Sequence, residues 1–452
     1  MTLESKSLEL LIEAVNRLEN GFSDLPPIET DYDMEAMRNV LLDVAERMKD
    51  NYPYFHPYYA GQMLKPPHPI ARLAYMLSLW INPNNHALDG GRASSAMEKE
   101  AVAAIAGMFG WDKHLGHICG GGTMANLEAL WVSGKMKSGM TIVASEQAHY
   151  THPRICEVLK LDFQAVPCDN QAVMDVNALK KMLDKGNIGT VIATIGTTGT
   201  GSVDPLPEIL KLKEQFGFRL HADAAYGGYF ILVGNLSPST LKAYDRITEV
   251  DSLAIDPHKH GLQPYGCGCV LFKDPGVGAL YKHDSPYTYF TSSDLHLGEI
   301  SLECSRPGAS AVALWATQQL LPMIPGGEFA VGLAKSRKAA LSLYKKILVD
   351  PRFITVVEPE LDIVTWAPRA DRASLISRRS EEIFKVAASQ NLHLAIFNYP
   401  TGLLRDKWPE VIMDRDQVTC LRSCLMKPEH FDHLDSIWQI LDKVANTVIT
   451  EK

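Results

Sequence analysis

The sequence has no long hydrophobic segment and no block of basic residues. Its longest apolar runs, such as Leu73–Ile81, are much shorter than the roughly 20 residues that a membrane-spanning helix needs. The formal net charge is −9, so we expect neither a nucleic-acid partner nor a membrane span. The first residues lack the basic and apolar regions of a signal peptide, which favours a cytoplasmic protein.

Closely spaced metal ligands are also missing. The eight cysteines are scattered, and only Cys267/Cys269 and Cys420/Cys424 lie near each other in the sequence. Neither pair has a second pair at the spacing of a zinc ribbon, and the histidines of the first 90 residues match no ligand motif. We therefore expect reduced thiols in a cytosolic protein and no bound metal.

The composition is that of a globular protein, 46% hydrophobic and 21% charged, and 452 residues are enough for more than one domain. We predict an N-terminal segment of helices and loops at 1–92, a large α/β domain at 93–325 and a small α+β domain at 326–452. The helices predicted in the first segment span residues 5–20, 33–50 and 70–81.

From Trp111 onward, short apolar strands alternate with helices. The predicted strands span residues 116–119, 140–144, 163–166, 190–195, 218–222, 252–255 and 267–272. This alternation is typical of an α/β protein whose central sheet, here with seven strands, is mostly parallel and covered by helices on both faces. After residue 353, two strands and a helix are followed by two more strands and a second helix, which predicts a small α+β domain.

The stretch Asp251–Gly261, DSLAIDPHKHG, places a lysine between two histidines just after a short buried strand. A lysine in this position can form a Schiff base with pyridoxal phosphate (PLP). It can equally be a surface lysine after a core strand.

Parallel sheets bind ligands at the carboxyl ends of their strands, and other polar motifs follow predicted strands here. Cys119–Thr123, CGGGT, precedes a helix, where glycines let the backbone approach a phosphate. Glycine-rich turns before helices are common without a ligand. His149 lies in the turn after the predicted strand at 140–144. Its ring can stack on a flat heteroaromatic ring, or it can simply begin the next helix.

Two further motifs complete the set. Thr194–Thr198, TIGTT, offers small hydroxyl side chains for a ring or phosphate, or forms a plain turn. Asp223 lies among small residues, where its carboxylate can pair with a pyridine nitrogen or accept hydrogen bonds from backbone donors. Together these motifs provide a phosphate cradle, a stacking ring, a carboxylate and an amine, each after a different strand.

The sequence resembles the group II PLP-dependent amino-acid decarboxylases of fold type I, which include glutamate, cysteine-sulfinate and aromatic amino-acid decarboxylases. The resemblance runs from about Pro53 to Leu441. It is strongest at HADAAYGG (221–228) and DPHKHG (256–261), and it includes GTT (196–198). Further similar segments are HPYYAGQM (56–63), CSR (304–306) and LRSCLMKP (421–428).

The resemblance implies a role for each matching residue. Lys259 would carry the cofactor, Asp223 would pair with its ring nitrogen, and Ala225 and His149 would pack on its two faces. The remaining implied cofactor-binding residues are Gly122, Thr123 and His258 at the phosphate, Asp256 nearby and Thr198 at the ring hydroxyl. Gln62 and Arg422 would face the substrate. The resemblance also implies a homodimer in which the loop at 84–95 reaches the partner's site.

One position departs from the family pattern. The tyrosine that donates a proton in this family aligns with Leu295, and we consider His296, the next residue, as its substitute. Tyr287 and Tyr289 precede it, and a histidine without any role is the alternative. We expect decarboxylation of an L-amino acid to its amine, with an aromatic substrate slightly favoured over an acidic one.

Other functions remain open at this point. A carbon–carbon lyase or an aldehyde-forming enzyme of the same fold is the alternative that Leu295 suggests, and a PLP-binding regulator without turnover is another. A dinucleotide-binding domain is disfavoured, because GxGxxG does not follow the first core strand.

Overall fold

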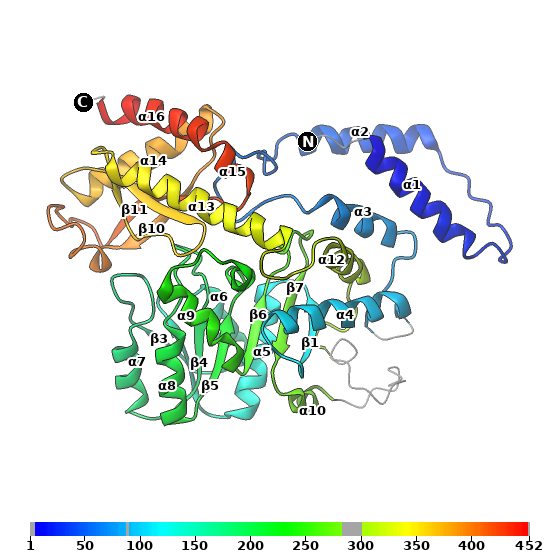
Figure 1. Cartoon of the computed structure of the whole chain (residues 1–452), viewed down its shortest axis with the longest axis horizontal. Coiled ribbons are helices and arrows are strands. Elements are labelled where there is room, and N and C mark those ends of the chain that lie inside the picture. The colour runs from blue at the N-terminus through cyan, green and yellow to red at the C-terminus, as the bar shows by residue number, and fades with distance from the viewer. Residues whose placement is uncertain (1–4, 87–89, 283–300, 451–452) are drawn as a thin grey trace.

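The structure, a computed structural model, describes residues 5–86, 90–282 and 301–450. Its centre is a seven-stranded sheet with the strand order β1-β7-β6-β5-β4-β2-β3 (Figure 1). The strands are β1 (Leu115–Cys119), β2 (Thr141–Ser145), β3 (Phe163–Val166), β4 (Ile188–Thr194), β5 (Arg219–Asp223), β6 (Ser252–Ile255) and β7 (Gly268–Phe272). The predicted α/β class and mostly parallel seven-stranded sheet are confirmed.

Strands β2 to β6 pair in parallel, whereas β7 is antiparallel to both of its neighbours, β6 and β1. Consequently β1 runs in the same direction as β6. The carboxyl ends of β1, β2, β4, β5 and β6 therefore meet along one edge of the sheet, as the sequence-based argument requires.

Helices connect the strands and cover both faces of the sheet (Figure 1). They are α4 (Arg92–Met108), α5 (Gly122–Met136), α6 (Thr151–Leu159), α7 (Val176–Leu183), α8 (Leu206–Phe216), α9 (Pro238–Asp245), α10 (Gly278–Tyr281) and α12 (Gly308–Leu320). The short 3₁₀ turns are η2 (Gly228–Leu232), η3 (Ile247–Glu249), η4 (Pro275–Val277) and η5 (Thr401–Leu403).

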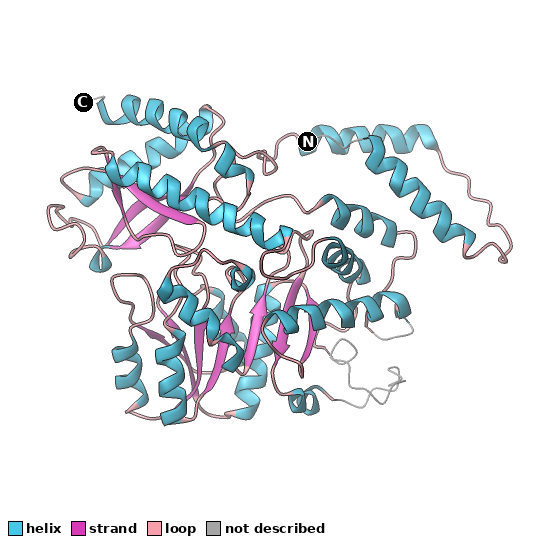
Figure 2. Cartoon of the chain, in the orientation of Figure 1, coloured by secondary structure: helices cyan, strands magenta, loops and turns pink. Residues whose placement is uncertain are grey.

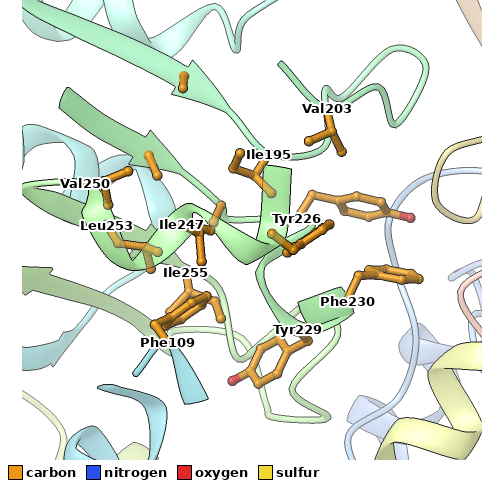
Figure 3. Close-up of a cluster of buried hydrophobic side chains, with 14 of the residues drawn as sticks. Phe109, Ile195, Val203, Tyr226, Tyr229, Phe230, Ile247, Val250, Leu253 and Ile255 are labelled. Atoms are coloured by element: carbon orange, nitrogen blue, oxygen red, sulfur yellow. The ribbon is translucent and has the colours of Figure 1, made fainter. Parts of the chain in front are cut away.

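Alternate residues of the central strands enter different cores. Val191 and Ala193 of β4 pack in the large cluster with α7, α8 and α9, whereas Ile192 packs in the cluster with α5 and α6. The large cluster also contains the aromatic residues Phe109, Tyr229 and Phe230 (Figure 3). A strand buried on both faces reads as a continuous apolar run, which is why these strands are recognisable in the sequence.

The C-terminal part of the chain forms a second, antiparallel sheet with the order β10-β11-β9-β8 (Figure 2). Its strands are β8 (Phe353–Thr355), β9 (Ile363–Pro368), β10 (Ala395–Pro400) and β11 (Gln417–Cys424). The accompanying helices are α13 (Glu328–Val349), α14 (Ala373–Ser389), α15 (Glu429–Asp432) and α16 (Leu434–Thr450). The predicted small α+β arrangement is present.

The first helices lie apart from both sheets. Helices α1 (Ser5–Asn20) and α2 (Met34–Met48) project from the body of the protein, while α3 (Pro69–Ser78) packs against α12 (Figure 1). None of the residues of α2 is buried. Within the described ranges, none of the helices combines the length and apolar character needed to cross a bilayer.

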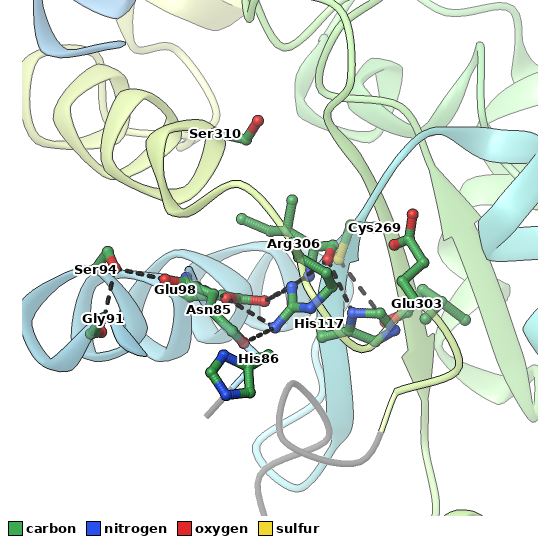
Figure 4. Close-up of polar contacts among 12 residues, drawn as sticks. Asn85, His86, Gly91, Ser94, Glu98, His117, Cys269, Glu303, Arg306 and Ser310 are labelled. Carbon is green, nitrogen blue, oxygen red and sulfur yellow. Dashed lines mark hydrogen bonds and ion pairs between the residues drawn. The ribbon is translucent and has the colours of Figure 1, made fainter. Parts of the chain in front are cut away.

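A buried ion pair fastens the loop before α4 to the sheet (Figure 4). The Arg306 guanidinium donates through Nη1 to Glu98 Oε1 at 2.8 Å and to the Ile118 carbonyl oxygen at 2.6 Å, and through Nη2 to the Asn85 carbonyl at 2.8 Å. Arg306 and Glu98 are 5% and 0% exposed, so each charge depends on the other. The pair joins segments that lie about 200 residues apart in the sequence.

We predict that Arg306→Ala lowers the free energy of unfolding by about 3–5 kcal/mol, because it leaves the Glu98 carboxylate buried without its charge partner. Chemical denaturation followed by circular dichroism measures this change. Arg47→Ala is the matched control: its ion pair with Asp43 is exposed, so we expect a loss below about 0.5 kcal/mol. Equal losses in the two variants would contradict the prediction.

Candidate active site

A cavity of about 530 Å³ lies at the edge where the parallel strands end. Its walls come from the turns after β1, β2, β4, β5 and β6. All the cofactor-binding residues predicted from the sequence line it, namely Gly122, Thr123, His149, Thr198, Asp223, Ala225, Asp256, His258 and Lys259. The structure thus brings together motifs that are up to 140 positions apart in the chain.

Lys259 lies in the turn that follows β6. Its Nζ is 3.0 Å from Asp256 Oδ2, and His258 Nε2 is 3.5 Å from the same oxygen. Asp256 is almost fully buried, and within the described residues its second oxygen, Oδ1, has no hydrogen-bond partner. The carboxylate therefore holds the lysine amine at the wall of the cavity through Oδ2, and its Oδ1 can still accept a hydrogen bond.

Asp223 ends β5 and is 5% exposed. Its Oδ2 accepts a hydrogen bond from His152 Nε2 at 3.0 Å, and its Oδ1 accepts one from the Ala225 backbone N–H at 3.2 Å. Burial by itself would raise the pKa of Asp223, but the hydrogen bond and charge of His152 and the charge of Lys259 together hold this pKa well below its usual value. Asp223 is therefore ionised at neutral pH.

His152 is a functional residue that the sequence-based reasoning missed. It is fully buried in the first turn of α6, three residues after His149, and its Nδ1 has no hydrogen-bond partner among the described residues. The available signal was a second histidine three residues after His149, in the first turn of the helix that follows.

His149 is half-buried beside the cavity. Its Nδ1 accepts a hydrogen bond from the Thr151 backbone N–H at 3.2 Å and lies 2.7 Å from the Thr151 hydroxyl, so its proton is on Nε2. Burial is the main cause that lowers the pKa of His149, which favours the neutral ring. The imidazole therefore keeps one N–H donor.

The turn Gly120–Gly122 leads into α5 with the geometry of an anion cradle. Gly121 has a φ of 146°, which favours glycine, and no side chain caps the helix start. A Cβ on Gly122 would lie 2.7 Å from Asp256 Oδ2, and one on Gly268 would lie 2.5 Å from Gly121 Cα. Only small residues allow this close packing, and the first N–H groups of the helix remain without intrahelical acceptors.

The two predicted substrate residues contact each other beside the cavity and do not line it. Arg422 is 4% exposed and donates through Nη2 to Gln62 Oε1 at 2.6 Å. Its Nη1 donates to the Thr198 carbonyl oxygen at 2.7 Å, and Thr198 does line the cavity. The guanidinium is thus one residue away from the cavity wall. His296, Leu295, Tyr287 and Tyr289 lie outside the described residues.

Comparison with known proteins identifies the family of this chain. The family model described as the pyridoxal-dependent decarboxylase conserved domain matches residues 123–367, which is more than half of the chain. The chain belongs to the pyridoxal-dependent decarboxylase family. The predicted resemblance to the group II enzymes is confirmed.

Individual relatives are more distant. A probable L-tyrosine/L-aspartate decarboxylase of Methanothermobacter thermautotrophicus is 28% identical over 326 residues, covering 72% of this chain and 86% of the relative. The L-aspartate decarboxylase of Thermococcus kodakarensis is 28% identical over 331 residues, covering 72% and 83%. The crystal structure of Oryza sativa TDC with PLP and tryptamine has a TM-score of 0.79 at 16% identity, covers 99% of both chains, and shows the fold type I architecture.

The cofactor of the family is pyridoxal phosphate, and the residues of this decarboxylase fit it. The uncapped start of α5 suits a phosphate, the ionised Asp223 suits a protonated ring nitrogen, and the Lys259 amine suits an aldehyde. Buried polar atoms without partners, Asp256 Oδ1 and His258 Nδ1, lie on residues of the same cavity. Such unsatisfied groups are expected where a polar ligand belongs.

We predict that His152→Phe weakens PLP binding. The pH below which the enzyme loses PLP should rise by about 1–3 units. Asp223 has a depressed pKa, so its favourable interactions are complete above the pKa of a free carboxyl and are lost as the pH falls through the folded-state pKa. Without the His152 donor, burial dominates and raises that pKa. Spectroscopic titration of bound PLP against pH measures the limit.

The matched variant is His152→Gln, whose amide can still donate a hydrogen bond to Asp223. We expect it to lose PLP at a pH between those of the wild type and His152→Phe. Identical pH limits in the wild type and His152→Phe would show that His152 does not set the ionisation of Asp223.

Proposed function

We propose that this protein decarboxylates an aromatic L-amino acid as a cytoplasmic homodimer, using Lys259, His149 and His296 as catalytic residues. The observation that carries the proposal is the cavity in which the Lys259 amine, the Asp223–His152 pair and the uncapped start of α5 all meet. This combination provides an amine, a fixed negative charge and an anion seat within one cavity.

The residues around Lys259 have different roles in the proposed reaction. When bound, PLP supplies an electron sink that takes up the electron pair released as CO2 leaves the substrate. Asp223, kept ionised by His152, would hold a proton on the pyridine nitrogen. The positive charge there would keep the ring able to accept electrons. Asp256 orients the Lys259 amine through the 3.0 Å contact.

The remaining cavity residues place the cofactor. Gly122 and Thr123 offer backbone N–H groups to the phosphate, where His258 adds a side chain. Ala225 and His149 would bound the two faces of the ring, and Thr198 would face its hydroxyl. The neutral His149 ring keeps a proton on Nε2, which makes it a donor within reach of the cavity. His296, our substitute for the usual tyrosine, lies outside the described residues.

Gln62 and Arg422 favour binding of the substrate carboxylate, because Arg422 is buried and carries a charge that the described part of the chain pairs with no carboxylate. An acidic substrate would need a second cation for its side chain. The described cavity residues offer only Lys259 and the two histidines 149 and 258. Aromatic rings also lie near Gln62, which favours an aromatic side chain: the Tyr59 hydroxyl accepts a hydrogen bond from the Gln62 backbone N–H at 3.2 Å, and the Tyr54 ring lies 4.9 Å from that of Tyr59.

The homodimer is supported by the projecting helices α1 and α2. On α2 the apolar residues Met37, Val40, Leu41 and Val44 are 48–69% exposed, and on α1 Leu10 and Ile12 are about 60% exposed. A soluble protein rarely leaves such an apolar face in water, and obligate dimers bury faces of this kind. We infer that residues 1–92 dock on a second copy of the chain. All eight cysteines are free thiols, which favours the cytoplasm.

We predict that the purified enzyme loaded with PLP releases CO2 from L-tyrosine with a kcat/KM at least about tenfold higher than from L-aspartate, because the described lining of the cavity includes no arginine and no lysine besides Lys259 for an acidic side chain. Lys259→Ala removes the amine and should abolish turnover. Manometric or isotopic CO2 assays across the twenty amino acids, with amine quantified by chromatography, provide the measurement.

The product ratio separates the alternatives. One amine per CO2 supports decarboxylation, whereas aldehyde or hydrogen peroxide in place of amine would establish the aldehyde-forming alternative. Bound PLP without CO2 from any amino acid would identify a regulator. Preference for L-aspartate would overturn the aromatic assignment alone.

We predict that Leu41→Glu/Val44→Glu dissociates the dimer, because two charges then replace apolar contacts in the α2 interface. Sedimentation velocity should give a species near twice the 50.0 kDa chain mass for the wild type and one chain mass for the variant. Arg38→Glu/Lys49→Glu is the control, since it changes two exposed charged residues of the same region. A monomeric wild type would refute the dimer.

A further inference from the structure

A second cavity, of about 490 Å³, lies on the other side of the turn that carries Lys259. Lys259 lines the first cavity, whereas the next residue, His260, lines the second, and the two cavities share no lining residue. The walls of the second cavity come from the segment before α3, the turn after Lys259, the start of α13 and the segment after β11. Its volume is in the range of small-molecule sites.

Two lysines line this cavity, and neither forms a direct ion pair within the described residues. Lys427 is 4% exposed, and its Nζ donates to the Tyr59 carbonyl oxygen at 2.7 Å. Lys65 is partly buried, and its Nζ is 3.4 Å from the Met426 carbonyl oxygen. Among the described residues neither nitrogen has a carboxylate within ion-pair distance, and the two acids that line the cavity, Glu328 and Glu429, are exposed. Both amines therefore lack a direct ion pair, although the charges of the buried Asp362 and of Glu429 act on Lys65 from farther away.

The pKa values of both amines are lower than that of an exposed lysine. Burial and, second, the charge of Lys65 lower the pKa of Lys427 to about 7. Burial lowers the pKa of Lys65 to about 8, although the charges of Asp362 and Glu429 act in the opposite direction. Negative charge bound beside the two amines would favour their protonated forms.

His260, on the same wall, has ring nitrogens without hydrogen bonds. It is fully buried, and within the described residues neither of its ring nitrogens makes a hydrogen bond. The nearest carboxylate oxygen, Asp362 Oδ2, lies 3.4 Å from Nε2. A buried imidazole without hydrogen bonds is costly unless a ligand satisfies it.

Helix α13 also begins at this cavity. Its first residues, Glu328 and Phe329, line the wall, and Gly327 at the helix start supplies no side-chain cap. Figure 1 shows this long helix running from beside α12 toward the small sheet. The positive end of its dipole favours negative charge nearby. The rest of the wall is largely apolar, with Leu262, Leu333 and Met426.

We propose that this cavity binds a small organic carboxylate, with its charged group between Lys65 and Lys427 and its apolar body against Phe329 and Met426. The site does not use Lys259 or PLP and is therefore separate from the proposed decarboxylation.

The test is a calorimetric titration of the PLP-loaded enzyme with phenylacetate, with 2-phenylethylamine as the analogue that lacks the carboxylate. We expect phenylacetate to bind in this cavity and 2-phenylethylamine not to do so. Lys65→Met/Lys427→Met should weaken this binding at least tenfold. Lys345→Met, an exposed lysine of α13, should leave it unchanged.

Lys65→Met alone serves if the double variant does not fold, because it removes only a 3.4 Å contact, and we expect at least a threefold loss of affinity. Lys259→Ala should retain binding in full. Phenylacetate that binds equally to the wild type and to Lys65→Met, or acts only as a competitive inhibitor whose potency Lys65→Met leaves unchanged, would place it in the active site and overturn the proposal.

Discussion

The register of the parallel strands determines where the groups of the active site lie. Thr194 of β4 is opposite Asp223 of β5, and Asp223 is opposite Ala254 of β6, so the residues that leave these strands enter one cavity. Side chains alternate across a sheet, and a shift of β5 by one residue would turn Asp223 to the opposite face. The antiparallel β7 completes the arrangement, because it lets β1 run in the direction of β6 and brings Gly121 to the same edge.

Buried charges in this protein have distinct partners, and those partners determine the chemistry. Glu98 is neutralised by Arg306, which secures the loop before α4. Asp223 is paired with His152, which keeps it ionised in a buried place, while Asp256 is shared between Lys259 and His258. Only the last group includes Lys259, which we propose as the cofactor-bearing residue, and there Asp256 Oδ1 has no hydrogen-bond partner among the described residues.

The sequence predicted the fold well where structure depends on local patterns. Apolar strands alternating with amphipathic helices indicated the sheet, and the polar motifs after them indicated one shared edge, because parallel strands end together. The position of β7 between β1 and β6 was not predictable, since residues about 150 positions apart pair there without a local signal. His152 was missed because only its direct hydrogen bond to Asp223, 71 positions later in the sequence, links it to the site. The contact of Gln62 with Arg422 spans 360 positions, and only family resemblance suggested it.

The exposed helix α2 has a consequence for how the protein is made. No residue of this helix is buried within its own chain. In the dimer that we propose, its apolar side chains are open to chaperones and proteases until a second copy covers them. The abundance of the folded enzyme in a cell should then depend on the rate at which newly made chains encounter each other, which couples survival of the polypeptide to its rate of synthesis.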